Sequence, residues 1–242
     1  MNTRELARVP VSTGTIGLRR DARQVAFPDV ATKVLLIRHA EVENPKRILY
    51  GHLPGFGLSE RGRAQARAVG ERLRDSGLSR IIHSPLQRAV ETAQLIAEGM
   101  GREVPLVPNA ELREAEFSRY LQGVPYWQIP MRRPLWFVHR TRRGLLPGDE
   151  TVDQMGGRIL DVVRHAAADH PGEVTALVSH ADPLQATWVL LDRRPLTERE
   201  MVRKQIGRAG VLELDLEGTR IVGVAYTPTP ELTPPADAER VA

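Results

Sequence analysis

Leu35-Leu36-Ile37-Arg38-His39-Ala40-Glu41 is the stretch that decides the fold, because an apolar run with the character of a buried strand ends there abruptly on an arginine and a histidine. A second apolar run, residues 174–178, is followed by Ser179 and His180, and Arg88 lies shortly after a third run. The carboxyl ends of parallel strands meet at one edge of a sheet, where ligands bind. Two histidines and two arginines gathered at that edge would form a pocket for a phosphoryl group.

Predicted strands and helices alternate along most of the chain. Strands are predicted at residues 33–38, 80–83, 104–107, 174–179, 211–216 and 221–226, with the last two forming a hairpin. Helices are predicted over residues 59–75, 84–100 and 152–169 and from about residue 183, with Ser59 and Ser84 as N-caps. The alternation predicts an α/β fold, a three-layer sandwich with a mostly parallel central sheet and helices on both faces.

The chain of 242 residues is 41% hydrophobic, which is enough for one well-packed domain, expected at residues 33–226. Residues 1–32 show neither helical nor strand periodicity, and residues 227–242 are rich in proline, so both ends are expected to be flexible extensions. No apolar run approaches the roughly 20 residues of a membrane span. We therefore expect a cytoplasmic protein with no membrane partner.

Composition narrows the chemistry. Cysteine is absent, which excludes disulfides, thiolate nucleophiles and cysteine-ligated metal sites. The basic residues behind the net charge of +4 mostly alternate with acidic ones on predicted helices, as on a solvated surface. Residues 117–148 differ, because they carry six arginines and no acidic residue, and a local positive field is expected there. Without a nucleic-acid-binding motif elsewhere, we expect no nucleic-acid partner.

Six short motifs occur in order along the predicted domain. They are Arg38-His39-Ala40-Glu41, Leu58-Ser59-Glu60-Arg61-Gly62-Arg63-Ala64-Gln65-Ala66, Ser84-Pro85-Leu86-Gln87-Arg88-Ala89-Val90-Glu91-Thr92-Ala93, Leu112-Arg113-Glu114, Gly148-Asp149-Glu150-Thr151 and Ser179-His180. Each is weak alone, but in this order they resemble the motifs of the histidine phosphatase superfamily, the phosphoglycerate mutase-like fold. The resemblance extends over residues 33–226.

The resemblance implies roles for the residues at the sheet edge. His39 would be the nucleophile that forms a phosphohistidine, for which neutral imidazole is suited near pH 7. Arg38 and Arg88 would bind the non-bridging phosphate oxygens, because guanidinium donors match phosphate geometry. His180 would bind phosphate and offset the charge of the transition state.

A carboxyl group must protonate the leaving oxygen and later activate water. The motif assigns this role to Glu114, and Glu111 and Glu116 stand close enough in sequence to exchange with it. Glu150 falls near the pocket, either as a substrate contact or as a cap of the helix at Val152 through the helix dipole.

Three positions depart from the family pattern. Ala40 and Ala181 stand where the family commonly has glycine, and the change at Ala40 need not block attack. Asp182 follows Ala181, where its carboxylate would either repel phosphate or orient His180. Asn44 is one residue nearer the nucleophile than the usual asparagine, so we do not expect it to bind phosphate.

Specificity is expected from residues 41–56 and 123–147, which would overhang the pocket. Trp127, Arg132 and Arg133 are candidate substrate contacts, since the second segment mixes aromatic and basic side chains. The alternative is that the aromatic residues of this segment anchor a lid onto the core.

The resemblance therefore implies a metal-independent phosphomonoesterase that acts through phosphohistidine on a small phosphorylated metabolite, without a cofactor. A core of this length is closer to the broad-specificity phosphatases than to the longer cofactor-dependent mutases. A phosphoglycerate mutase is the nearest alternative, and a non-catalytic module that binds a phosphorylated ligand is a second. A homodimer is left open.

Overall fold

The structure of the protein, a computed structural model, describes residues 31–230 except 117–120, 142 and 147. The predicted N-terminal extension and Pro-rich tail therefore lie outside the described residues, apart from 31–32 and 227–230. Thr32 and Thr227 belong to strands, so the first and last strands extend one residue beyond the predicted domain boundaries at each end.

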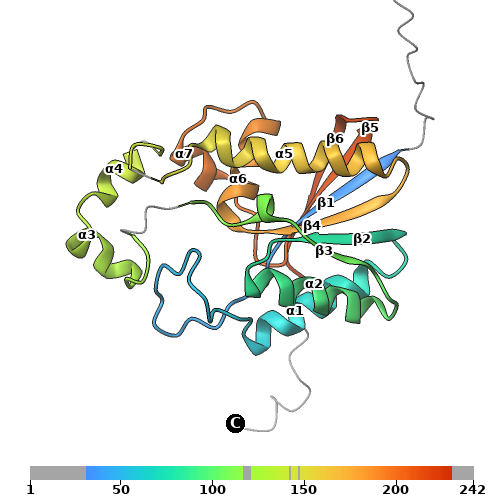
Figure 1. The fold of residues 1–242 in the computed structure, drawn as a ribbon, viewed down its shortest axis with the longest axis horizontal. Helices are drawn as coiled ribbons and strands as arrows, with labels where there is room; N and C mark the ends of the chain where they lie inside the picture. Colours follow the sequence, from blue (N-terminus) through green and yellow to red (C-terminus); the bar gives the residue numbers. More distant parts are fainter. Residues whose placement is uncertain (1–30, 117–120, 142, 147, 231–242) are drawn as a thin grey trace, which may run out of the picture.

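One six-stranded sheet forms the centre of the fold (Figure 1). Its strands are β1 (Thr32–Arg38), β2 (Leu78–His83), β3 (Leu106–Pro108), β4 (Val174–Ser179), β5 (Val211–Glu217) and β6 (Arg220–Thr227). The strand order is β3-β2-β4-β1-β5-β6, in which β3, β2, β4 and β1 run parallel. β5 pairs antiparallel with β1, and β6 pairs antiparallel with β5, which is the predicted hairpin.

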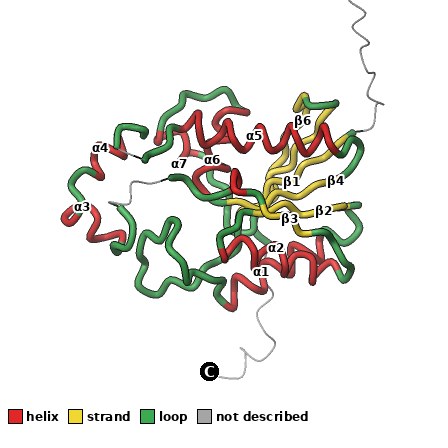
Figure 2. The backbone as a smooth tube through the Cα atoms, viewed as in Figure 1, coloured by secondary structure: helices red, strands yellow, loops and turns green. Residues whose placement is uncertain are grey.

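Seven α-helices are described: α1 (Glu60–Arg72), α2 (Gln87–Met100), α3 (Ile129–Arg132), α4 (Trp136–Thr141), α5 (Val152–Asp169), α6 (Ala181–Leu191) and α7 (Glu198–Arg203). Short 3₁₀ helices occupy Ala110–Leu112 and Tyr126–Gln128. α1 and α2 cover one face of the sheet, and α5 and α6 cover the other (Figure 2). This arrangement confirms the predicted three-layer α/β sandwich.

β1 shows how the sequence builds this core. Leu35 and Ile37 pack among the residues of α1 and α2, whereas Val34 and Leu36 pack among those of α5 and α6. Because successive side chains of a strand point to opposite faces, a continuous apolar run can serve two hydrophobic layers at once. β1 is therefore buried on both sides, and its polar continuation emerges only at its carboxyl end.

α1 and α2 pack with their backbones in close approach. A Cβ atom on Gly70 of α1 would lie 2.2 Å from the carbonyl oxygen of Ile96 in α2. One on Gly99 of α2 would lie 2.3 Å from the carbonyl oxygen of Arg67 in α1. The two glycines thus allow an interhelix contact that any larger side chain would prevent.

Helix boundaries agree best where capping groups act. Ser59 caps α1 by accepting a hydrogen bond from Gly62 N, as predicted. α5 has the predicted bounds, and Thr151 and Gln154 form a reciprocal capping box at its start. α2 differs, because it begins at Gln87 after Leu86 rather than at Pro85 after Ser84. Among the described residues, no helix combines the length and the apolar composition needed to cross a bilayer.

Candidate active site

The ends of β1 and β4 bring two histidines together. His39 follows β1, and its backbone N–H donates to the carbonyl oxygen of Ser179 in β4 at 2.9 Å. His180 follows Ser179 directly and lies just before α6. The two imidazole rings are 5.1 Å apart between centroids, and both residues are almost fully buried. The structure therefore brings the two histidines together at one sheet edge, as the sequence predicts.

His39 is held in one tautomer. Its Nδ1 lies 2.8 Å from the carbonyl oxygen of Ala40, and because a carbonyl can only accept, Nδ1 carries the proton. The backbone N–H of Ala40 is held in turn by Thr92 Oγ1 at 3.1 Å. Burial, reinforced by the charges of Arg88 and Arg38, lowers the pKa of His39 well below its usual value. Nε2 therefore keeps its lone pair at neutral pH, which is the form that a nucleophile requires.

His180 is fixed through both of its ring nitrogens. Nδ1 accepts from Arg88 Nε at 3.2 Å, so Nε2 is the protonated nitrogen, and it lies 2.8 Å from Ser84 Oγ. Burial and the neighbouring charge of Arg88 lower the pKa of His180 well below its usual value. Ser84 is thus tied to His180, and it also accepts from Leu86 N, instead of capping α2.

Two arginines flank the histidines. Arg88 lies in the first turn of α2 with 1% of its surface exposed, donates from Nη2 to Gly51 O at 2.8 Å, and stands 4.8 Å above the Tyr50 ring. Arg38 donates from Nη1 to Ile206 O at 2.8 Å. Burial lowers the pKa of both groups, but a guanidinium stays charged at neutral pH. Two positive charges therefore face the imidazoles.

Glu114 is the carboxyl group of this centre. It is buried, and its Oε1 accepts from Ala115 N at 2.9 Å. Burial, helped by the charge of Asp182 and opposed by Arg88, raises the pKa of Glu114 to about 7. The alternative carboxyls lie elsewhere, since Glu111 is exposed and Glu116 is half-exposed beside His52 and Arg113. The geometry favours Glu114 among the three.

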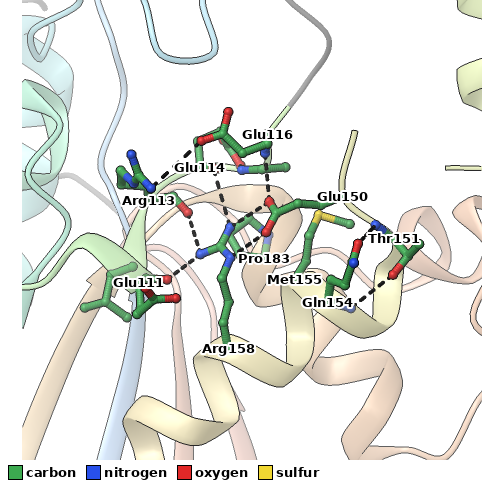
Figure 3. A network of polar contacts seen from close by, with 12 residues as sticks. Glu111, Arg113, Glu114, Glu116, Glu150, Thr151, Gln154, Met155, Arg158 and Pro183 are labelled. Carbon is green, nitrogen blue, oxygen red and sulfur yellow. Dashed lines mark hydrogen bonds and ion pairs between the residues drawn. The ribbon is translucent and has the colours of Figure 1, made fainter. Parts of the chain in front are cut away.

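Arg158 of α5 holds the backbone of the loop that carries Glu114 (Figure 3). It donates from Nη1 to the carbonyl oxygens of Glu111 and Arg113, the latter at 2.9 Å, and from Nη2 to that of Glu114 at 3.4 Å. One guanidinium thus bonds to three carbonyl oxygens of the loop. The position of the Glu114 carboxyl depends on this contact from the neighbouring helix.

Glu150 bonds to Arg158 and to the Glu114 loop rather than capping α5. We call Arg158 and Glu150 together the clamp. Glu150 Oε1 accepts from Arg158 Nε at 2.9 Å, and Glu150 Oε2 accepts from the backbone N–H of Glu116 at 2.8 Å (Figure 3). Thr151 supplies the helix cap instead. The predicted capping role of Glu150 is therefore wrong, and its side chain fixes Arg158 and the loop.

The donor set of the centre fits an anion better than a metal. Ligand atoms of His39, Glu114 and His180 lie within 4.8 Å of one another, a grouping that the sequence analysis did not anticipate. Two histidines and a carboxylate can bind transition metals. Here, however, both nitrogens of His180 are engaged in hydrogen bonds, and the charges of Arg38 and Arg88 oppose a cation.

A cavity of about 370 Å³ opens from this centre. The described residues that line it are Arg38, His39, Leu49, Tyr50, Gly51, Glu114, Leu121, Tyr126, Ile129, Trp136, His139, Arg143, Ala181, Asp182, Gln185, Glu198, Val202 and Gln205. Arg88 and His180, which bond to each other, are not among these lining residues. The inner end is the sheet edge. The outer end is lined by residues of α6 and α7 and by Leu121, Tyr126, Ile129, Trp136, His139 and Arg143.

Comparison with known proteins agrees with this geometry. The family model of the histidine phosphatase superfamily (branch 1) matches residues 34–227. This chain belongs to the histidine phosphatase superfamily. The resemblance drawn from the six motifs is thereby confirmed.

Two curated proteins have similar sequences. Uncharacterized protein Rv0525 of Mycobacterium tuberculosis is 35% identical over 199 residues, which cover 81% of this chain and 96% of the relative. Phosphoglycerate mutase-like protein 4 of Arabidopsis thaliana is 30% identical over 176 residues, which cover 70% of this chain and 74% of the relative.

Solved structures share the fold. YhfR of Bacillus stearothermophilus superposes with a TM-score of 0.73 at 25% identity, over 83% of this chain and 98% of that one. The mycobacterial glucosyl-3-phosphoglycerate phosphatase Rv2419c in complex with VO3 gives a TM-score of 0.63 at 26% identity, over 75% and 92%. The family includes both phosphatases and mutases, so the chain is an enzyme of that broad class.

The outer residues predicted to contact substrate do not line the cavity. Trp127 is 69% exposed, and Arg132 bonds to Gln128 on the surface. Neither these two residues nor Arg133 lines the cavity, which therefore gives no support to their predicted substrate contacts. The same holds for Glu150.

Asp182 is held by a partner that the sequence did not indicate. Arg143 Nη2 donates to Asp182 Oδ2 at 2.7 Å, and Arg143 Nε donates to Glu198 Oε2 at 2.5 Å. The three residues come from separate parts of the chain, and no local pattern pairs them. Tyr126 and Trp136 of the aromatic segment do line the cavity, and Trp136 also packs on a small cluster with Leu121. Trp136 thus packs on the protein core, as the alternative prediction for the aromatic residues of this segment expected.

Proposed function

We propose that this histidine phosphatase is a metal-independent phosphoric monoester hydrolase that acts through a phosphohistidine at His39 Nε2. The observation that carries the proposal is the bond from His39 Nδ1 to Ala40 O at 2.8 Å, because it leaves Nε2 as the unprotonated nitrogen in a cationic pocket. The neighbouring Glu114, with its pKa raised to about 7, can act both as an acid and as a base.

In the first step, the Nε2 lone pair of His39 attacks phosphorus, and the bond from phosphorus to the leaving oxygen breaks. The Glu114 carboxyl gives its proton to that oxygen, so the alcohol leaves neutral and the phosphoryl group stays on nitrogen. Arg38 and Arg88 offer donors to the non-bridging oxygens, whose charge they offset in the transition state. The Nε2–H of His180 adds a further donor when it exchanges Ser84 Oγ for a phosphate oxygen.

In the second step, water attacks the phosphohistidine. The Glu114 carboxylate takes a proton from the water while the bond between phosphorus and Nε2 breaks, and inorganic phosphate leaves. The carboxyl group is then protonated again and His39 has recovered its lone pair. The cycle needs no group beyond these side chains and water.

Relatives support hydrolysis, since a similar solved structure carries the name glucosyl-3-phosphoglycerate phosphatase and was obtained with VO3. Another relative is named phosphoglycerate mutase-like protein 4, so a mutase that transfers the phosphoryl group is the alternative function. The two differ in the fate of the phosphoryl group, which goes to water in one case and back to a bound acceptor in the other.

The test is a rapid quench of the enzyme mixed with ³²P-labelled phosphomonoesters, with phosphate release and 3-phosphoglycerate isomerisation followed in parallel. We expect an acid-labile, base-stable phosphoenzyme and phosphate release, both absent in His39→Ala. His165→Ala, which changes an exposed histidine of α5, is the matched control and keeps both signals. Isomerisation without release would make the protein a mutase, and full activity in His39→Ala would end the nucleophile assignment.

A further inference from the structure

We propose that the outer end of the cavity selects a phosphomonoester whose leaving group is uncharged and hydroxyl-bearing, such as a sugar or polyol, and disfavours one that carries a second anionic group. This inference rests on the proposed function, because it concerns the part of the substrate beyond the phosphoryl group. It is carried by the charges and hydrogen-bonding groups of the outer wall.

One side of the outer wall is formed by a charge triad, which we define as Arg143, Asp182 and Glu198. Arg143 Nη2 lies 2.7 Å from Asp182 Oδ2 and 3.3 Å from Glu198 Oε1, and Arg143 Nε lies 2.5 Å from Glu198 Oε2. The Arg143 side chain is only 5% exposed. One positive charge is thus shared by two carboxylates, and the triad as a whole carries one net negative charge.

The arginines near this wall do not reverse its sign. Arg132 donates to Gln128 Oε1 at 3.0 Å on the surface, and Arg140 lies over the Trp136 ring at 5.2 Å from its centroid. Neither of them lines the cavity, and Arg133 does not line it either. The basic residues that do line the outer wall, among those described, are Arg143 and His139. Arg143 bonds to the two triad carboxylates, and His139 Nδ1 lies 2.7 Å from Asp149 Oδ2, so carboxylates of the protein already face both groups.

The remaining outer groups suit hydroxyl groups and a ring face. Gln185 and Gln205 supply amides that both donate and accept, and the triad carboxylates can accept from hydroxyls. Tyr126 and Trp136 also line the cavity and offer amphipathic rings. Burial and neighbouring carboxylates raise the pKa of Tyr126 to about 12, so its phenol stays a neutral donor.

Charge separates the two ends of the cavity. At the inner end, Arg38 and Arg88 attract the phosphoryl group, whereas an anionic substituent at the outer end would face the net charge of the triad. One end of the cavity thus favours an anion and the other disfavours one. This difference selects a monoester of a neutral alcohol over a phosphorylated acid or a bisphosphate. A repulsion of this kind at a half-buried site corresponds to a discrimination of at least about tenfold.

The test compares two substrates that differ in a single group. Glycerol 3-phosphate carries a hydroxymethyl group where 3-phosphoglycerate carries a carboxylate, so the ratio of their kcat/KM values isolates the charge. We expect the wild type to prefer glycerol 3-phosphate at least about tenfold. Glu198→Gln, which leaves the triad neutral, should reduce the ratio severalfold. The ratio does not depend on the fraction of folded enzyme.

Glu217→Gln is the matched control, because Glu217 is an exposed glutamate paired with Arg220 on the β5–β6 hairpin, away from the cavity. It should keep the wild-type ratio. Equal or better use of 3-phosphoglycerate by the wild type would overturn the inference, and so would a ratio that stays unchanged in Glu198→Gln.

A binding measurement separates this inference from the proposed chemistry. If neither compound is turned over, both are titrated into the wild-type protein by calorimetry. Tighter binding of glycerol 3-phosphate, with the difference reduced in Glu198→Gln, would support the inference and leave the failure with the phosphatase mechanism. Equal affinities would overturn the inference itself.

Discussion

The inner and outer ends of the cavity are built on different principles. At the inner end, His39 and His180 continue two adjacent strands, and each polar side chain makes at least one bond to another site residue or to backbone. At the outer end, short helices and loops carry the lining residues, and rings such as Tyr126 are half exposed. A rigid sheet edge suits chemistry that must be repeated without error, whereas a loop-borne wall can change with the substrate.

The largest effect is expected when a charge is removed from the inner end. Arg88→Ala should lower kcat/KM for any phosphomonoester by about 10² to 10³-fold, because it removes phosphate donors and the partner of His180 Nδ1. Arg132→Ala, an exposed arginine of the outer segment, should change kcat/KM less than about twofold. Steady-state kinetics check both, and similar losses in the two variants would erase the proposed difference between the ends.

A smaller effect, dependent on the leaving group, is expected from the clamp formed by Arg158 and Glu150. Arg158→Lys loses the fork that holds the Glu114 loop, so kcat/KM for an alkyl phosphate should fall about 10- to 100-fold, within the usual contribution of a general acid. Para-nitrophenyl phosphate needs little acid assistance because its leaving group is already acidic, so its kcat/KM should change far less.

Arg164→Lys, on the exposed face of the same helix, is the control for this clamp and should match the wild type. Equal losses for both substrates in Arg158→Lys would mean that the clamp supports folding alone rather than the placement of Glu114.

Asp182 links the two ends and should set the pH dependence. The Asp182 charge helps to raise the pKa of Glu114 to about 7, so Asp182→Asn should lower that pKa. Glu114 must be protonated to act as the acid, and the alkaline limb of the kcat/KM profile should therefore move to lower pH. Asp161→Asn, an exposed change on α5, should leave the limb in place. An unmoved or higher limb in Asp182→Asn would show that Asp182 does not act on Glu114.

Two tryptophans sharpen the definition of the outer wall. Trp136→Ala should raise KM severalfold with little change in kcat, because Trp136 lines the cavity, whereas the exposed Trp127→Ala should leave both constants within about twofold. Thermal melts identify any loss of folding in Trp136→Ala. A larger KM effect at Trp127 would restore the substrate contact predicted from the sequence.

The smallest effect is expected from a chelator. Activity in excess EDTA should equal that of the untreated enzyme, since Arg38 and Arg88 make the His39, Glu114 and His180 cluster unfavourable for a cation. A rate that is lost in EDTA and restored by added Zn²⁺ would instead assign the cluster to a metal.

The inner end could be predicted because its signals are local. Apolar runs locate β1 and β4, and the residues that follow them must meet wherever the strands are adjacent and parallel. The predicted bounds of α5 agree with the structure, in which the neighbouring residues Thr151 and Gln154 cap its start. The start of α2 was predicted wrongly, because Ser84 and Pro85 carry a helix-start signal, whereas Ser84 Oγ bonds to His180, which follows β4 far along the chain.

The outer end depends on contacts between distant residues. The charge triad joins residues separated by loops and helices, and Glu150 meets Arg158 only because one turn of α5 faces the Glu114 loop. Composition indicated that residues 117–148 are basic and aromatic, but it could not tell which rings face inward. Tyr126 and Trp136 line the cavity, while the adjacent Trp127 does not.

The close contact between α1 and α2 has a mechanical consequence for the phosphate pocket. Gly99 lies near the end of α2, and Arg88 lies near its beginning, about 16 Å away along a stiff rod. A single methyl group at Gly99 would clash with the backbone of α1 and shift the C-terminal end of α2 away from it. The close contact of two glycines therefore helps to set the position of the Arg88 guanidinium, to which we assign phosphate binding.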